Sequence, residues 1–197
     1  MLVVEKPQPM LSTPGRLPEN RDSLISRLQL QFPSAELVHR LDMATSGLML
    51  IALSKPASRS LSKQFQQRTI KKRYHAILQG HVQDNSGTID LPIITDWERR
   101  PLQKVCHESG KPSLTRYSVI EHLDNLTTRI VFEPVTGRSH QLRIHSLNIG
   151  HPILGCQLYK SCDSHKKAQR LMLHASFIRF EHPLSGKTME FASEPPF

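Results

Sequence analysis

The spacing of apolar residues predicts three helices along the chain. One is expected over residues 21–31, with Asn20 as a candidate N-cap, and a second over residues 56–68. A third and shorter helix is expected over residues 139–149, and Gly150 follows it at the position that glycine favours after a helix. The remaining apolar runs are short and favour strands.

Short apolar or alternating runs predict strands throughout the chain. The expected strands are residues 2–4, 47–53, 72–82, 87–94, 115–120, 126–133, 170–180 and 188–192. Many strands with few helices between them indicate a largely antiparallel sheet, and therefore an α+β fold. Pro and Gly are spread evenly and no repeat or linker interrupts the chain, so residues 1–197 are expected to form a single domain.

Composition narrows the setting of this domain. No apolar run reaches the length of a membrane-spanning helix and the N-terminus lacks the pattern of a signal peptide, so a cytoplasmic protein is expected. The three cysteines, Cys106, Cys156 and Cys162, are odd in number and lack CxxC spacing, which argues against a disulfide framework or a thiolate zinc site. No heptad pattern argues for assembly, so a monomer is the expected state.

Basic residues outnumber acidic ones, 26 to 17, and give a formal net charge of +9. Such a surface attracts polyanions such as RNA or DNA, but charge alone leaves specific binding open. The segment 96–112 lies between two predicted strands and holds Trp97, Arg99, Arg100, Lys104, His107 and Lys111. A basic loop with an aromatic residue suits looped RNA, but a solvated hairpin with the Trp packed beneath it fits the same composition.

The densest polar cluster is residues 39–47, at the start of the predicted strand 47–53. Asp42 is followed there by Thr45 and Ser46, whose hydroxyls could hydrogen-bond its carboxylate and hold its rotamer. A carboxylate at the end of a sheet is a usual place for a catalytic group, but Asp also forms ordinary Asx and capping turns. Both interpretations stay open on this cluster alone.

Two later clusters carry further polar groups. Residues 136–145 surround a predicted helix N-terminus, where phosphate binds favourably, and Arg143 could keep a nearby Asp carboxylate ionised and oriented. The alternative is a surface helix with solvated arginines. Residues 71–76 lead three cations into a strand that contains Tyr74, which could stack on a base or transfer a proton, or could be an ordinary strand tyrosine.

Metal ions and nucleotide cofactors have no expected site. None of the 11 histidines belongs to an HExxH motif or a Cys/His zinc pattern. Neither a Walker motif nor GxGxxG occurs. We therefore expect neither a cofactor nor a catalytic metal.

Three segments taken together resemble the signatures of the RluA-type family of RNA pseudouridine synthases. They are HRLDMATSGLMLIAL, KKRYHAILQGHV and TGRSHQLRIHSLNIGHPILG, in the family's order, and the resemblance runs from about Leu2 to Phe197. It implies the pseudouridine synthase fold, a mixed and mostly antiparallel central sheet in two abutting lobes with flanking helices and an active-site cleft. It also implies a reaction that needs neither cofactor nor metal. The loop DWERRPLQKVCHESGKP looks closest to the family's dual-specificity branch, which acts on 23S ribosomal RNA and on the anticodon stem-loop of certain tRNAs.

The resemblance also implies roles for individual residues. Asp42 corresponds to the essential carboxylate, Arg143 to its salt-bridge partner, and Tyr74 to the tyrosine that stacks on the target base and assists removal of its C5 proton. Arg40 looks like the arginine that fills the space left by a flipped uridine, and Leu154 like an apolar wall of the uracil pocket. The further candidates for contacts to substrate or RNA are His39, Thr45, Arg99, Arg100 and Lys104.

Two departures from the family and three rival hypotheses remain. Family members usually have a strand before the segment at Leu2, and some carry an S4-like RNA-binding domain, so we expect a truncated N-terminal strand and a catalytic domain that recognises RNA by itself. The rivals are a non-catalytic RNA-binding protein, a metal-dependent hydrolase built on the histidines and Asp42, and a synthase restricted to tRNA or to rRNA. Target choice depends on loop shape and on how far the RNA refolds, which the sequence does not reveal.

Overall fold

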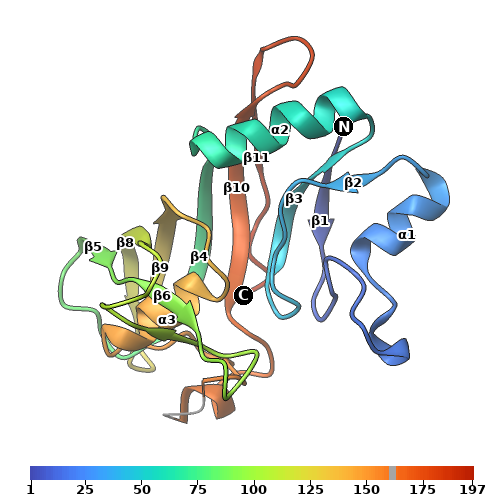
Figure 1. Ribbon diagram of the computed structural model, residues 1–197. Helices are drawn as coiled ribbons and strands as arrows, with labels where there is room; N and C mark the ends of the chain where they lie inside the picture. The colour runs from blue at the N-terminus through green and yellow to red at the C-terminus, as the bar shows by residue number, and fades with distance from the viewer. Residues whose placement is uncertain (160–162) are drawn as a thin grey trace. The chain divides into compact units, whose positions relative to one another are not determined.

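The computed structural model describes residues 1–159 and 163–197, which form two compact units (Figure 1). The first unit consists of Met1–Lys72 and His174–Pro196, and the second of Arg73–Leu173 with Phe197. Cys162 lies outside the described residues. Each unit contains several strands and at least one helix.

The strands of the first unit come from both ends of the chain. They are β1 (Leu2–Lys6), β2 (Glu36–Leu37), β3 (Ser46–Ala52), β10 (Leu173–Glu181) and β11 (Thr188–Ala192). β3 pairs antiparallel with β1 and β2 and parallel with β10, and β11 pairs antiparallel with β10. Every residue of β3 is buried, which confirms the buried strand predicted from its unbroken apolar run.

Helix α1 (Leu24–Gln31) begins later than the sequence pattern predicts. Residues Pro18–Asn20 form a short 3-10 helix, η1, so Asn20 does not cap α1 and that prediction is wrong. Ser23 is the N-cap instead, and its Oγ accepts the N–H of Ser26 at 3.2 Å. A capping side chain must lie directly before the first helical turn, and the 3-10 turn moves that position along the chain.

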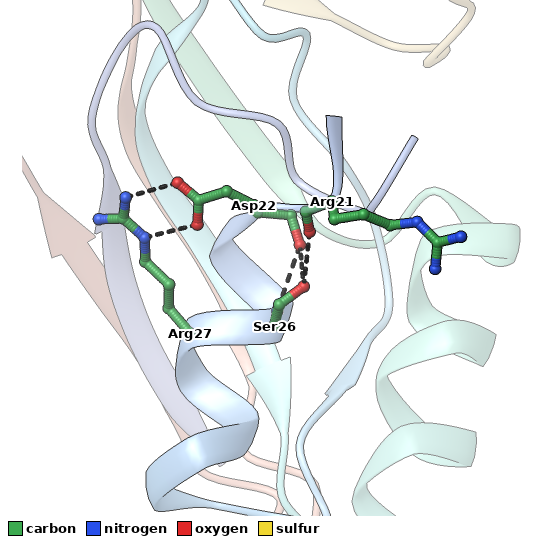
Figure 2. Close-up of polar contacts among 5 residues, drawn as sticks. Arg21, Asp22, Ser26 and Arg27 are labelled. Atoms are coloured by element: carbon green, nitrogen blue, oxygen red, sulfur yellow. Dashed lines mark hydrogen bonds and ion pairs between the residues drawn. The ribbon is translucent and has the colours of Figure 1, made fainter. Parts of the chain in front are cut away.

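The turn before α1 carries an exposed ion pair (Figure 2). Arg27 donates from Nε and Nη2 to the two carboxylate oxygens of Asp22, at 2.8 and 2.6 Å. Ser26 Oγ donates to the carbonyl of Arg21 at 3.2 Å. Both charged side chains are about 60% accessible, so water screens the ion pair. The pair therefore adds little to the stability of the unit.

Helix α2 (Lys55–Gln67) lies across β3 and β10 (Figure 1) and covers the core of the first unit. Pro56 lies in its first turn, as the pattern over residues 56–68 predicts, and the structure adds Ser54 as the N-cap. The buried apolar core comprises Leu48, Leu50, Ala52, Ala57, Leu61, Ile70, Ile178 and Phe180. Gln64 fixes the helix on the sheet, because its amide donates to the carbonyl of Glu181 and accepts the N–H of the same residue, both at 2.9 Å.

The second unit has antiparallel sheet strands in the order β4-β9-β8-β5, a separate hairpin and a buried helix. The sheet strands are β4 (Lys71–Gln79), β5 (Ser86–Asp90), β8 (Leu114–Leu123) and β9 (Thr127–Pro134). The hairpin joins β6 (Ile93–Thr95) to β7 (Gln103–Val105), and the helices are α3 (Gln141–Asn148) and the 3-10 helix η2 (Asp163–Lys166). The strands predicted over residues 72–82, 115–120 and 126–133 are confirmed.

Two features of this unit differ from the prediction. The single strand expected over residues 87–94 is two strands, because the chain leaves the sheet at Leu91 and Pro92, and a proline has no N–H to donate to a ladder. The loop expected over residues 96–112 contains β7. The predicted α+β class with a mostly antiparallel sheet is confirmed in both units. No helix among residues 1–159 and 163–197 is long and apolar enough to cross a membrane.

Candidate active site

Asp42 lies in a turn of the first unit, shortly before β3 begins. Its side chain is half-buried, and its carbonyl accepts the N–H of Thr45 at 3.0 Å. The residue before it is fixed by Ser12, whose Oγ donates to the carbonyl of Leu41 at 2.7 Å and accepts the N–H of Leu41 at 3.1 Å. The backbone on one side of Asp42 is therefore held by a buried hydroxyl.

The other side of the Asp42 turn is held by a buried lysine. Lys6, at the end of β1, is fully buried, and its ammonium donates to the carbonyls of Pro7, Met10 and Met43 at 2.9, 2.8 and 3.1 Å. The carbonyl of Met43 also accepts the N–H of Met10 at 3.2 Å. Charge-assisted bonds to three carbonyls make this a stiff support for the turn. The sequence analysis missed Lys6 and Ser12, because the partners that link them to the Asp42 turn, Met43 and Leu41, lie more than 25 residues away in the chain.

The hydroxyl residues after Asp42 are buried at the start of β3. Thr45 is 3% exposed and Ser46 is 4% exposed. Ser46 Oγ shares a hydrogen bond with His174 Nδ1 at 2.9 Å, and His174 Nε2 shares another with Ser193 Oγ at 2.9 Å. Ser46 is therefore engaged with β10. The expected bond from Thr45 to the Asp42 carboxylate stays a prediction.

His39 is packed inside the first unit. Its ring stacks on Phe65 with 4.5 Å between ring centres, and its Nε2 accepts the backbone N–H of Leu50 at 2.9 Å. Burial, and after it the nearby ammonium of Lys72, lower the pKa of His39 to about 3, so the imidazole is neutral at pH 7. A neutral, stacked ring has no charge for a phosphate, so its contact to RNA stays a prediction that these surroundings do not support. Arg40, next to it, is exposed.

Tyr74 and Leu154 both lie along β4 in the second unit. Tyr74 is half-buried and faces Phe132 across the β4–β9 ladder. Leu154 is 5% exposed, and its N–H donates to the carbonyl of Ile77 at 2.9 Å. The segment that carries Leu154 therefore runs beside the same strand as Tyr74, and its role as an apolar wall of the uracil pocket stays a prediction.

Arg143 is buried on α3, with an exposure of 4%. Its Nε donates to the Sγ of Cys156 at 3.3 Å, and its guanidinium carbon lies 5.4 Å from the ring centre of Tyr159. The alternative of a surface helix with solvated arginines is therefore wrong for this residue. Tyr159, which the sequence analysis missed, also accepts the N–H of Gln103 at 3.0 Å and shares a hydrogen bond with His140 Nδ1 at 2.7 Å.

Gln141 holds the start of α3 in place. Its amide oxygen accepts from Thr136 Oγ1 at 2.8 Å and from the N–H of Arg138 at 3.0 Å. Its amide nitrogen donates to the carbonyl of Leu114 at 3.0 Å and to Thr115 Oγ1 at 2.9 Å. All the hydrogen-bonding capacity of this buried amide is directed at the loop before α3 and at β8. Gln141 therefore fixes the start of the helix that carries Arg143.

The turn between β6 and β7 presents the cations that the sequence singled out. Asp96 is 3% exposed, and its carboxylate lies 2.7 Å from Arg99 Nη2 and 3.9 Å from Lys104 Nζ. Trp97 is 66% exposed, and the guanidinium carbon of Arg100 lies 3.5 Å from its ring centre. The alternative in which the Trp packs beneath the hairpin is therefore wrong.

The described residues thus bring the candidates together in two sets. Asp42 and Thr45 share the first unit with His39 and Arg40, and the second unit holds Tyr74, Arg143, Leu154, Arg99, Arg100 and Lys104. The pairing of Asp42 with Arg143 joins the two sets and stays a prediction. Among residues 1–159 and 163–197, no group of three or more His, Cys, Asp or Glu side chains is arranged to hold a metal ion.

Comparison with known proteins decides the family. Residues 1–148 match the model of the RNA pseudouridylate synthase family. This chain belongs to the RNA pseudouridine synthase family. It is therefore an isomerase that converts uridine to pseudouridine in RNA.

Individual relatives of this synthase cover nearly all of it. It is 50% identical over 197 residues to the dual-specificity RNA pseudouridine synthase RluA of Escherichia coli K12, which matches 100% of this chain and 90% of that protein. It is 51% identical to the protein of that name from Yersinia pestis, over 100% of this chain and 96% of the relative. The structure of human RNA pseudouridylate synthase domain containing 1 superposes with a TM-score of 0.82 at 32% identity, over 99% of this synthase and 80% of that chain. These matches confirm the fold inferred from the three signatures.

Proposed function

We propose that this synthase isomerises uridines of 23S ribosomal RNA and of tRNA anticodon stem-loops, with the carboxylate of Asp42 as its essential group. The observation that carries the assignment to Asp42 is the support of its turn. Ser12 fixes the backbone before it and Lys6 the backbone after it. A catalytic carboxylate needs such a fixed position, because a displacement of about 1 Å can lower a rate about 100-fold.

The reaction itself requires only acid, base and nucleophilic chemistry. The N1–C1′ bond of uridine breaks, the uracil turns in place, a C5–C1′ bond forms, and the proton on C5 leaves. Asp42 either attacks C1′ or C6 as a nucleophile or removes a ribose proton to give a glycal-like intermediate. Both routes require an ionised carboxylate next to the sugar. No electron is transferred and no group is added, so no cofactor enters the balance.

Arg143 is the proposed partner that keeps Asp42 ionised. A guanidinium buried to 4% exposure is unfavourable unless an anion compensates it. Cys156 and Tyr159 orient the planar group from two sides, which suits a bidentate salt bridge to a carboxylate.

The remaining candidates act on the base and on the RNA. Tyr74 stacks on the uracil and assists removal of the C5 proton, and Leu154 keeps water away from the turning base. Arg40 fills the space of the flipped nucleotide, which offsets part of the unstacking cost of a few kcal/mol. Thr45 holds the Asp42 rotamer, and the cations that bind phosphate are Arg99, Arg100 and Lys104.

Release of tritium from RNA that contains [5-³H]uridine tests the role of Asp42. Asp42→Asn and Asp42→Ala should bind RNA with unchanged affinity and release no tritium above background. Asp22→Asn is the matched control, because Asp22 is an exposed carboxylate of the same unit whose partner is Arg27 (Figure 2). Normal release by Asp42→Ala would refute the assignment.

The same assay tests Arg143. Arg143→Lys should lose most of its activity, at least about 100-fold, because an ammonium cannot reproduce the planar fork of a guanidinium. Full activity of Arg143→Lys would rule out the bidentate partner role. A chelator separates the synthase from a metal-dependent hydrolase, and we expect tritium release to be unchanged by it.

The RNA targets are tested in the cell. Pseudouridines mapped in total RNA from a deletion strain should be missing from both 23S rRNA and tRNA anticodon arms, and should return on complementation. Loss from only one RNA class would establish the restricted rival. We place the enzyme in the cytoplasm, where both RNAs occur. We expect it to act as a monomer.

A further inference from the structure

We propose that Trp97, supported by Arg100, is a stacking platform for an unpaired base of the RNA substrate, separate from the uridine that reacts. The proposal rests on the proposed function, since it names a contact that the same RNA makes. The occupant is a nucleotide base next to phosphate groups, and the platform is the β6–β7 turn of the second unit.

The first observation is the exposure of a large aromatic ring. Trp97 is 66% exposed, whereas Tyr159, another aromatic side chain of the same unit, is 8% exposed. An indole left in water forgoes the favourable burial of a large apolar surface. An exposed aromatic residue in a basic surface is what proteins use to stack single-stranded bases.

The second observation is the guanidinium on the ring. The guanidinium carbon of Arg100 lies 3.5 Å from the centre of the Trp97 ring, the distance of a stacked cation–π pair. Arg100 covers one face of the indole and leaves the other face for a base. Its guanidinium, held over the ring, adds positive charge to a surface that must also attract the phosphates of the same RNA.

The third observation is the rigidity of the turn. The buried carboxylate of Asp96 bonds Arg99 Nε at 2.8 Å, and the N–H of Arg99 donates to the carbonyl of Asp96 at 3.2 Å. Asp96 and Leu102 are joined by a backbone bond of 2.9 Å across the turn. Trp97 and Arg100 are thus presented on a closed turn, and little conformational entropy remains to be lost when RNA binds.

The charge around the ring selects a polyanion as the partner. Three cations, Arg99, Arg100 and Lys104, occupy the same turn and the strand that follows it. Arg99 and Lys104 contact the Asp96 carboxylate, but their side chains remain largely exposed. An apolar peptide would gain nothing from these cations. A looped RNA offers both the phosphate charge and the exposed base.

Trp97 is the only tryptophan of the chain, which makes the test direct. The Asp42→Ala variant, which leaves the RNA unmodified, is titrated with an anticodon stem-loop while tryptophan fluorescence is recorded. Stacking of a base should quench the emission to a saturating plateau. A fully paired duplex of the same length and charge should bind by its phosphates and leave the emission nearly unchanged. Equal quenching by both would overturn the stacking contact.

Substitution separates stacking from charge. Trp97→Leu should weaken stem-loop binding roughly 5- to 100-fold, the range expected for loss of one base–aromatic stack, and Trp97→Phe should recover most of it. The slope of log K against log salt should stay as in the parent, because no ion contact is removed. Arg99→Gln with Lys104→Gln should reduce that slope. Leu126→Ala is the matched control, since Leu126 is 67% exposed in the same unit, and it should change neither quantity.

The failure of this proposal is distinguishable from failure of the proposed function. If the wild-type enzyme forms pseudouridine in the stem-loop while Trp97→Leu binds normally, only the platform is wrong. If no pseudouridine forms in any RNA tested, the proposed substrate is wrong, whatever the fluorescence shows. Normal affinity of Trp97→Leu, or affinity that Trp97→Phe fails to recover, would overturn the platform.

Discussion

At the scale of single residues, the neutral imidazole of His39 couples the stability of the protein to pH. The ring is stacked on Phe65, and its Nε2 must be unprotonated to accept the N–H of Leu50. Burial and the Lys72 charge lower the pKa of His39 to about 3, below the value near 6.5 of an unfolded chain. Between pH 3 and pH 6.5, the unfolded state therefore binds a proton on His39 that the folded state does not bind. The stability contribution is fully present above pH 6.5 and is lost as the pH falls toward 3.

Urea unfolding at several pH values measures this coupling. Between pH 7 and pH 5, we expect His39 to lower the free energy of unfolding by on the order of 2 kcal/mol. His39→Gln keeps an acceptor for the Leu50 N–H and does not titrate, so its unfolding free energy should fall less over the same range. Since burial also lowers the pKa of His145, some acid sensitivity should remain in the variant. Parallel curves for the two proteins would show that His39 is not the titrating group.

Gly47 is a residue at which any side chain is excluded. Its φ is +112°, and a Cβ there would lie 2.3 Å from the carbonyl oxygen of Ala175 on β10. Gly47→Ala should destabilise the protein by more than about 3 kcal/mol, because strain in the backbone adds to a clash with a neighbouring strand. Gly186→Ala is the control, since its φ of +67° is also positive but nothing lies within 4 Å of its Cβ. Equal losses in thermal unfolding for the two variants would contradict the clash.

At the scale of elements, α3 depends on the amide of Gln141. Gln141→Leu keeps the volume but removes all four hydrogen bonds of the amide, and the N–H of Arg138 loses its acceptor. We expect a loss of about 2 to 4 kcal/mol in the free energy of unfolding, from unsatisfied polar groups. Since Arg143 lies on the same helix, tritium release should also fall. Gln67→Leu on the exposed end of α2 should change neither property, and a loss there would point to a general effect of the substitution.

The elements that the sequence predicted well are those with a local signal. The apolar run of β3 and the period of α2 belong to residues near one another in the chain, and both were placed within one or two residues. The two-residue strand β2 and the three-residue strand β7 are too short for any period to show. Ser23, and not Asn20, caps α1 because a 3-10 turn precedes the helix, and no residue propensity indicated that turn.

The candidate site was predictable to the extent that a motif carries it. Asp42, Tyr74 and Arg143 came from recognisable signatures, and burial of Arg143 agrees with a role away from solvent. No sequence pattern indicated that Lys6 and Tyr159 support the site, because a lysine before a proline and a tyrosine in a loop look like surface residues. Their partners are set by the tertiary fold, which a local pattern does not contain.

At the scale of the whole molecule, the net charge of +9 acts on the binding of RNA and has little effect on the isomerisation step. Each phosphate contact releases counterions, so binding weakens as salt rises. For single strands, log K falls by about 0.7 per contact for each tenfold increase in salt concentration. The three cations of the β6–β7 turn and β7, Arg99, Arg100 and Lys104, would alone give a slope near −2. The reacting bonds lie in the base and sugar, and isomerisation leaves the phosphate charge unchanged.

Salt should therefore act on kcat/KM and spare kcat. In tritium-release assays over a series of salt concentrations, we expect log kcat/KM to fall with a slope steeper than about −2, while kcat at saturating RNA changes by less than about twofold. Replacing the three cations by Gln should reduce the slope by about 2 and leave kcat near its original value, because the charges act equally on bound substrate and transition state. A kcat that fell as steeply as kcat/KM would mean that these charges serve the chemical step, and the division between an electrostatic docking turn and the Asp42 centre would be wrong.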